Sequence, residues 1–156
     1  IWYFRAIPKL AMKYSSEISI AVPRKRLIEL FDNTENLSKW MKGLKSFETL
    51  EGEHGEVGAT ARMKFEMGKR KVDMLETILE SNFPHSFKAA YQATGVYNEV
   101  NNVFEDKGDH TLYTTEHYFK FNSWMMRFMG FLMPNAFKKQ SMVYLKDFKA
   151  FAEGAT

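Results

Sequence analysis

Apolar and polar residues alternate along most of the middle of the chain, and this period of two predicts β-strands. In residues 60–67, for example, Ala61, Met63 and Phe65 fall on one face, and charged residues fall on the other. The same pattern predicts a strand over residues 14–22, one that begins at Leu44, and further strands over residues 60–67, 71–80, 86–92, 97–105 and 111–121. Short turns join the last six, which favours an antiparallel meander.

A helical period of apolar residues appears in three places. Pro23 opens a first short helix, where its missing N–H costs nothing, and Asn36 caps a second one. A long helix restarts at Pro134 with lysines on its outer face. Its apolar stripe consists of Phe137, Tyr144, Leu145, Phe148 and Phe151.

The predicted order is therefore one strand, two short helices, six strands and one long helix. We expect an α+β fold in which a curved, seven-stranded antiparallel sheet wraps around the long C-terminal helix. The two short helices lie between strands 1 and 2. A straight helix cannot touch all of a curved sheet, so this arrangement predicts an internal cavity.

The cavity wall can be predicted from strand parity and from the helix stripe. A further part of the wall is predicted at residues 123–133, where eight of eleven side chains are large and apolar. We interpret this segment as a wall or lid, since Met and Phe suit a surface that adapts to its ligand. The alternative is ordinary packing between the last strand and the helix. The expected ligand-binding residues are Met63, Phe65, Tyr113, His117, Phe119, Phe128, Phe131, Phe137 and Tyr144.

Composition narrows the function classes. The chain has no cysteine, which excludes disulfides and thiolate metal sites and fits a cytoplasmic location. The net charge is only +3, and Lys and Arg are spread among 19 acidic residues, so nucleic acid is not an expected partner. No apolar run approaches the ~20 residues of a membrane span. We expect no metal and no cofactor.

The domain organisation is simple. Residues 1–11 include an apolar Ile-Trp-Tyr-Phe start and precede Met12, a plausible natural start, so we interpret them as a leader or an added segment. No repeat and no linker-like stretch interrupts residues 12–154, which we expect to form a single domain.

The four histidines do not have the spacing of metal ligands, and three of them fall in or beside predicted turns. His117 differs, because strand parity places it beside Tyr113 and Phe119 on the inner face. It could bind the polar head of a ligand or act as a general base. The alternative, which we favour at this point, is a histidine that is hydrogen-bonded within the core.

Other polar residues occupy predicted strands. An inward glutamate would be desolvated, and its pKa raised, unless it were paired. Parity does not decide which glutamates point inward, because one β-bulge reverses the assignment. The candidates are Glu76, Glu99 and Glu116. Asparagine is disfavoured in strands, so Asn98, Asn101 and Asn102 either hydrogen-bond a ligand or mark an edge or a bulge.

Several segments together resemble the START-like helix-grip superfamily, also called SRPBCC, which includes polyketide cyclase/dehydrase and lipid-transfer proteins. The matching segments, within a resemblance from about Met12 to Gly154, are ISIAVP at 18–23, LIELF at 27–31, NLSKW at 36–40, LEG at 50–52, VG at 57–58 and KGDHT at 107–111. The resemblance implies a helix-grip fold and the binding of a lipophilic small molecule. It implies no single activity, because its members include lipid carriers, cyclases and hydrolase activators, and no catalytic motif can be carried over.

Three functions follow as hypotheses. The first is the binding, or the binding and transport, of a lipophilic or aromatic small molecule in an internal apolar cavity. The second is a cyclase/dehydrase-type enzyme that uses a cavity His or Glu as acid or base, which the sequence favours less. The third is a membrane-surface protein in which residues 123–133, with Lys138 and Lys139, contact anionic lipid. The sequence leaves the oligomeric state open.

Overall fold

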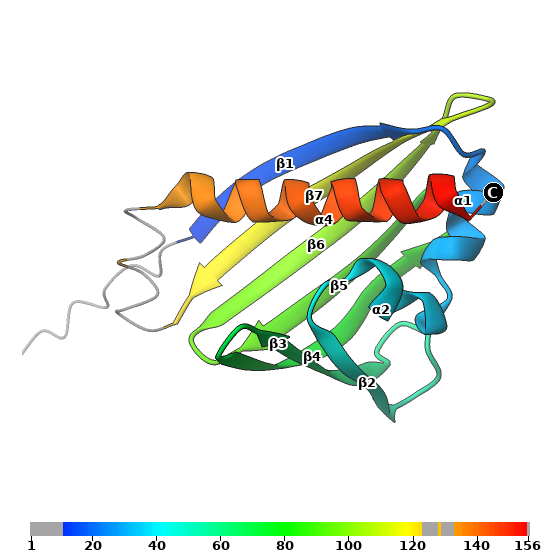
Figure 1. Cartoon of the computed structure of the whole chain (residues 1–156). Helices are drawn as coiled ribbons and strands as arrows, with labels where there is room; N and C mark the ends of the chain where they lie inside the picture. Colours follow the sequence, from blue (N-terminus) through cyan, green and yellow to red (C-terminus); the bar gives the residue numbers. More distant parts are fainter. Residues whose placement is uncertain (1–10, 123–127, 129–132, 156) are drawn as a thin grey trace, which may run out of the picture.

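Seven antiparallel strands form one curved sheet in the computed structural model of the chain, which describes residues 11–122, 128 and 133–155 (Figure 1). The strands are β1 (Ala11–Ile20), β2 (Leu44–Glu51), β3 (Thr60–Met67), β4 (Arg70–Asn82), β5 (Ser86–Ala93), β6 (Val96–Asp106) and β7 (Thr111–Phe121). Their order across the sheet is β1-β7-β6-β5-β4-β3-β2. The six consecutive strands β2 to β7 thus form the predicted meander, and β1 pairs with β7 at the end of the sheet.

Helices cover one face of this sheet. The short α1 (Arg24–Phe31) and α2 (Leu37–Trp40), with the one-turn 3₁₀ helix η1 (Thr34–Asn36) between them, connect β1 to β2. The long α4 (Pro134–Gly154) crosses the concave side of the sheet beside β1 (Figure 1). The predicted α+β fold, with its curved sheet, long C-terminal helix and two short helices, is confirmed. None of the described helices has the length and apolarity needed to cross a membrane.

The cap of the second short helix differs from the prediction. Asn36 does precede α2, but its side chain makes no capping hydrogen bond. Its Nδ2 donates to the Leu30 carbonyl at 3.2 Å, and its Oδ1 accepts from Lys39 Nζ at 3.0 Å. The side-chain cap lies one element earlier, at the start of η1, where Asn33 Oδ1 accepts from the backbone N–H of Glu35. Burial of Asn36 explains the difference, since its amide must satisfy a buried carbonyl.

The first strand begins earlier than predicted. Ala11 already pairs with Lys120 of β7, three residues before the predicted start at Tyr14. Residues 1–10 lie outside the described residues, so the leader, and with it the proposed domain boundary, stays a prediction.

A tight approach of two backbones requires glycine just before β2. Gly43 has φ 86°, and a Cβ built there would lie 2.7 Å from the Glu66 carbonyl oxygen. The Glu66 N–H in turn donates to the Gly43 carbonyl at 2.8 Å. Glycine therefore allows the α2–β2 connection to close against the end of β3.

The C-terminal half of α4 packs tightly against its neighbours around Phe148. Phe148 has no exposed surface, and its ring centroid lies 4.9 Å from that of Trp40 and 5.6 Å from that of Tyr113. Phe31 of α1 packs edge-on against the same ring at 5.8 Å. This aromatic cluster ties α1, α2, the sheet and α4 into one core.

The N-terminal half of α4 is held differently. Tyr14 Oη donates to the Phe137 carbonyl at 3.1 Å and lies 2.6 Å from Ser141 Oγ. These bonds fix α4 to the edge strand β1 rather than to the middle of the sheet. Space therefore remains between this half of the helix and the central strands.

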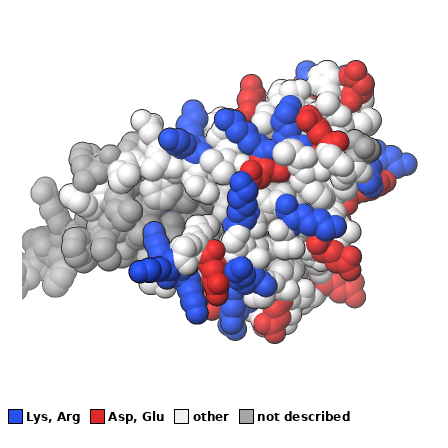
Figure 2. All heavy atoms as spheres, in the orientation of Figure 1, with Lys and Arg blue, Asp and Glu red and all other residues white. Residues whose placement is uncertain are grey.

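The outer surface carries charges of both signs. On the face shown in Figure 2, Lys and Arg side chains are interspersed with Asp and Glu. On this face, basic residues therefore do not form a patch free of acidic ones.

Candidate ligand-binding cavity

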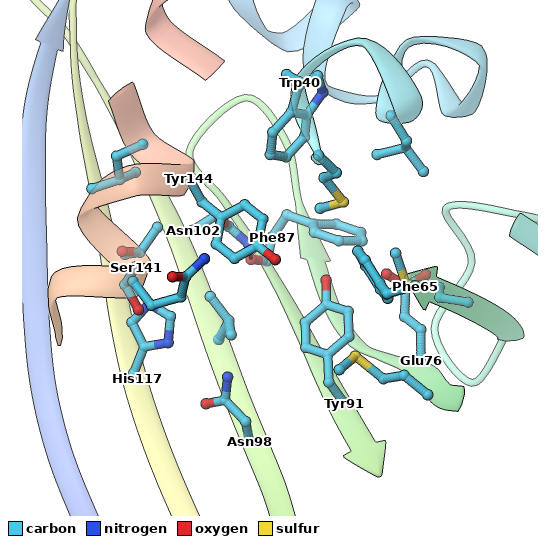
Figure 3. A pocket seen from close by; sticks show the side chains of 18 of the residues that line it. Trp40, Phe65, Glu76, Phe87, Tyr91, Asn98, Asn102, His117, Ser141 and Tyr144 are labelled. Carbon is cyan, nitrogen blue, oxygen red and sulfur yellow. Dashed lines mark hydrogen bonds between the residues drawn. The ribbon is translucent and has the colours of Figure 1, made fainter. Parts of the chain in front are cut away.

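A cavity of about 300 Å³ lies between the inner face of the sheet and the N-terminal half of α4 (Figure 3). This volume is at the lower end of the range for small-molecule sites. Apolar side chains provide most of its wall. They include Met63 and Phe65 from β3, Met74 from β4, Phe119 from β7 and Phe137 from α4.

Most of the residues predicted for binding lie on this wall. Those that line it are Met63, Phe65, Tyr113, His117, Phe119, Phe137 and Tyr144. Phe128 is 58% exposed and is not among the described residues that line the cavity. Phe131 lies outside the described residues, as does most of the predicted lid, 123–133. The part that these residues play in binding stays a prediction.

Polar side chains gather where β6 and β7 form the floor of the cavity. The β6–β7 polar group, as we call Asn98, Thr115 and His117, lies on the inner faces of these two strands. In the register, Asn98 is opposite Phe119, and His117 is opposite Val100. Asn98 and His117 are thus diagonal neighbours on the same face, within reach of one bound group.

The β6–β7 polar group has unused hydrogen-bonding capacity. Asn98 Oδ1, Thr115 Oγ1 and both ring nitrogens of His117 are buried and have no hydrogen-bond partner among the described residues. The neighbouring Asn102 is different, because its Nδ2 donates to the Phe87 carbonyl at 3.1 Å and its Oδ1 accepts from Tyr113 Oη at 2.6 Å. Buried polar atoms are normally paired, so the unpaired set marks this part of the cavity.

His117 is held between two aromatic rings. It stacks on Tyr14 with ring centroids 4.8 Å apart and on Phe119 at 6.0 Å. Burial lowers the pKa of His117 to about 4, so its ring is neutral at pH 7, with one nitrogen as donor and the other as acceptor. The favoured interpretation of a histidine hydrogen-bonded within the core is wrong for the described residues.

A glutamate and a tyrosine lie farther across the same floor. Glu76 of β4 is only 6% exposed and is opposite Tyr91 of β5 in the register. The Tyr91 hydroxyl donates to the Glu76 carboxylate, and this bond lowers the pKa of Glu76, but the larger effect of burial raises it. Burial, followed by the charge of Glu76, raises the pKa of Tyr91. Tyr91 is in turn opposite Asn98, so these residues form one row across β4, β5 and β6.

The other two candidate glutamates face away from the cavity. Glu99 accepts from Tyr97 Oη at 2.8 Å and pairs with Lys88 at 3.5 Å. Glu116 accepts from Asn101 Nδ2 at 3.2 Å. Of the three asparagines in β6, Asn98 and Asn102 point inward, whereas Asn101 is on the opposite face, as strand alternation requires.

Sequence reasoning missed one contact between a histidine and a carboxylate beside the cavity. His54 Nε2 lies 3.5 Å from Asp32 Oδ1, and both residues are part of the wall. Burial raises the pKa of Asp32, while the charge of His54 acts in the opposite direction. The two residues come from separate loops, and no spacing rule connects them. Within the part of the chain that the structure describes, no three His, Asp or Glu side chains form a group that could hold a metal ion.

Comparison with known proteins gives a fold but no close sequence relative. No protein-family model matches the sequence, and no curated protein matches it. Among solved structures, the Zhui aromatase/cyclase from Streptomyces sp. R1128 superposes with a TM-score of 0.77 at 11% identity, over 92% of this chain and 94% of that one.

Two further structures are similar over nearly their whole length. Norcoclaurine synthase from Thalictrum flavum, in complex with dopamine and hydroxybenzaldehyde, has a TM-score of 0.69 at 13% identity, with coverage of 95% of this chain and 90% of that one. A protein from Thermus thermophilus has a TM-score of 0.72 at 18% identity, with coverage of 93% and 99%. The chain therefore has the helix-grip fold that these proteins share, as its resemblance to the START-like superfamily implied.

Proposed function

We propose that this protein binds a lipophilic or aromatic small molecule in the cavity beneath the N-terminal half of α4. The cavity of about 300 Å³, with its largely apolar wall, is the observation that carries the proposal. The fold neighbour that was solved with dopamine and hydroxybenzaldehyde supports it by analogy. The cytoplasmic location expected from the absence of cysteine, and a role in transport, stay predictions.

Apolar burial sets the scale of the affinity. A ligand that loses about 300 Å² of apolar surface to the wall gains roughly 7 kcal/mol at about 25 cal/mol per Å². Association costs reduce this gain, and a Kd of 1 μM corresponds to about −8 kcal/mol. Apolar contacts alone therefore predict an affinity weaker than about 1 μM, and tighter binding requires specific polar contacts.

A single substitution that fills the cavity tests the proposal. Ala93 lines the wall at the end of β5, so Ala93→Phe would place a ring in the space that a ligand needs. The uncharged dye N-phenyl-1-naphthylamine, whose fluorescence rises in apolar surroundings, reports occupancy. We expect Ala93→Phe to abolish dye binding and the matched control Ala93→Ser to retain it. Unchanged dye affinity in a folded Ala93→Phe protein would contradict the proposal.

Native mass spectrometry of protein purified from its own host complements the dye experiment. A bound molecule that co-purifies with the protein would show its mass and thereby its chemical class. An added mass in the wild type that is absent from Ala93→Phe would place that molecule in the cavity.

Acid–base catalysis is the second candidate function, and Glu76 is the observation that favours it. A buried carboxyl with a raised pKa beside a tyrosine hydroxyl is a combination that can transfer a proton to or from an enolizable substrate. His117 is less suited, because a pKa of about 4 makes it a weak base at pH 7. Loss of turnover of a polyketide-like substrate in Glu76→Gln, with dye binding retained, would support this candidate over simple binding.

The membrane-surface hypothesis depends on residues 123–133. Of these, the structure describes Phe128 and Met133, which are 58% and 53% exposed. Co-sedimentation with anionic liposomes that is abolished by salt would support this hypothesis.

A further inference from the structure

The charges that border the cavity are unequal in sign. The described wall residues include two carboxylates, Asp32 and Glu76, but neither lysine nor arginine. His54 is the only described wall histidine with a carboxylate neighbour, and its partner is Asp32. His117 is buried among aromatic rings and neutral at pH 7. Among the described wall residues, a bound anion therefore meets no lysine or arginine.

An anionic ligand would meet two costs in this cavity. Its charge would leave water with no lysine or arginine among the described wall residues to compensate for the lost hydration. It would also share a low-dielectric space with Glu76, a like charge whose own carboxyl is already desolvated. Lipids with a free carboxylate or phosphate inside the cavity are thus disfavoured by the residues that line it.

The polar atoms on the floor favour a different head group. The neutral ring of His117 offers one donor and one acceptor, Asn98 Oδ1 is an acceptor, and the Thr115 hydroxyl is both. A hydroxyl can donate to one of these atoms while it accepts from another. Asn98 and His117 are diagonal neighbours across β6 and β7, so one hydroxyl can reach both. Bare hydrocarbon would leave all of them unpaired.

We propose that the cavity selects an uncharged, hydroxyl-bearing apolar molecule, such as a phenol, with its hydroxyl between Asn98 and His117, and that it discriminates against anions of the same shape. This inference rests on the proposed function, since it specifies the ligand class of the same cavity. It differs from the general expectation of lipid binding because it excludes fatty-acid-like carboxylates.

Three probes with the same ring system test the proposal on the full chain at pH 7. Naphthalene, 2-naphthol and 2-naphthoate differ only in their substituent, and their Kd values can be measured by displacement of N-phenyl-1-naphthylamine. We expect 2-naphthol to bind about tenfold more tightly than naphthalene, which corresponds to about 1.4 kcal/mol. We expect 2-naphthoate to bind at least tenfold more weakly than 2-naphthol.

Two variants show whether the preference comes from the floor. His117→Phe keeps a flat ring against Tyr14 and Phe119 but removes both nitrogens, and Asn98→Leu removes the amide at similar size. In either variant, the tenfold preference for 2-naphthol over naphthalene should fall to about twofold or less. Thr114→Val, which removes a hydroxyl from the opposite face of β7, is the matched control and should keep the wild-type ratio.

The outcomes separate this inference from the proposed function. If naphthalene binds as tightly as 2-naphthol, if 2-naphthoate binds best, or if neither floor variant changes the ratio, the hydroxyl selectivity is wrong although the cavity binds ligands. If neither the dye nor any of the probes binds, the proposed function fails and this inference fails with it.

Discussion

Loss of a phenylalanine should lower mainly stability in the C-terminal half of α4 and mainly ligand affinity in its N-terminal half. Phe148 is fully buried among aromatic rings, with Trp40 at 4.9 Å, so Phe148→Ala leaves a cavity in the core and should cost about 3–5 kcal/mol of unfolding free energy. For a domain of this size, 1 kcal/mol shifts Tm by about 2–4 °C. The expected decrease in Tm is therefore roughly 6–20 °C.

Phe137 is half-buried and already faces open space in the cavity. Its ring contacts Phe119 at 5.2 Å and Phe121 at 5.4 Å. Phe137→Ala should cost about half of the roughly 1.5–3 kcal/mol expected for a fully buried side chain. It should also weaken dye binding several-fold, because the ring is part of the wall, whereas Phe148 is not among the wall residues.

Urea denaturation and dye titration of the two variants, both well below their Tm, give an unfolding free energy and a dye affinity for each. We expect Phe148→Ala to have low stability with wild-type dye affinity, and Phe137→Ala to have nearly wild-type stability with weakened affinity. Equal losses of stability in the two variants, with equal dye affinities, would show that α4 is packed uniformly. The division into a solid half and a hollow half would then be wrong.

Three further predictions concern pH and the attachment of the helix. Burial lowers the pKa of His117 from 6.5 to about 4. Between these pH values, the unfolded chain binds a proton that the folded chain excludes. Wild-type stability should therefore fall as pH decreases from 6.5 to about 4. His117→Phe should lack this part of the decrease in urea midpoint, and an identical pH profile would count against a buried, neutral ring. Burial raises the pKa of Glu76 above 4.5, so its charge opposes folding at higher pH. Glu76→Gln, whose amide oxygen still accepts from Tyr91, should therefore be more stable than wild type at pH 7 and equal to it below pH 4.5. The reverse dependence of stability on pH would refute this. Tyr14→Phe removes the hydroxyl that bonds to the start of α4, including Ser141 at 2.6 Å, and should cost about 0.5–1.5 kcal/mol in urea denaturation; unchanged stability would show that this contact does not hold the helix.

Local sequence pattern predicted the elements well where one face of a strand is buried. Residues 60–67 alternate without interruption, and residues 111–121 alternate less strictly, with Leu112 and Tyr118 on the outer face; β3 and β7 have these same bounds. The inward position of His117 followed from the same alternation. It succeeded because side chains in a strand must point to opposite faces in turn, whatever surrounds the strand.

The sequence pattern was insufficient to predict which face of the sheet the glutamates and asparagines in strands occupy. The pairing of β4 with β5 shifts between Ile78 and Glu80, and an irregularity of this kind reverses parity along one strand relative to the next. Glu76 precedes this shift and points into the cavity, whereas Glu99 of β6 forms a surface ion pair. Only the register of the whole sheet distinguishes them.

By itself, the sequence determined the order of the elements, the curved antiparallel sheet and the apolar stripe that binds the C-terminal helix to it. These features depend on interactions between residues that are near one another in the chain. The tertiary structure decided where α4 packs solidly, around Phe148, and where it leaves a cavity, beside Phe137. It also decided that Asn98 and His117 are diagonal neighbours, and that Asn98 Oδ1 and both His117 ring nitrogens have no hydrogen-bond partner among the described residues. These outcomes depend on the curvature of the sheet and on the contact by which Tyr14 of β1 holds the helix. Both set distances between residues far apart in the chain, and no local pattern encodes such distances.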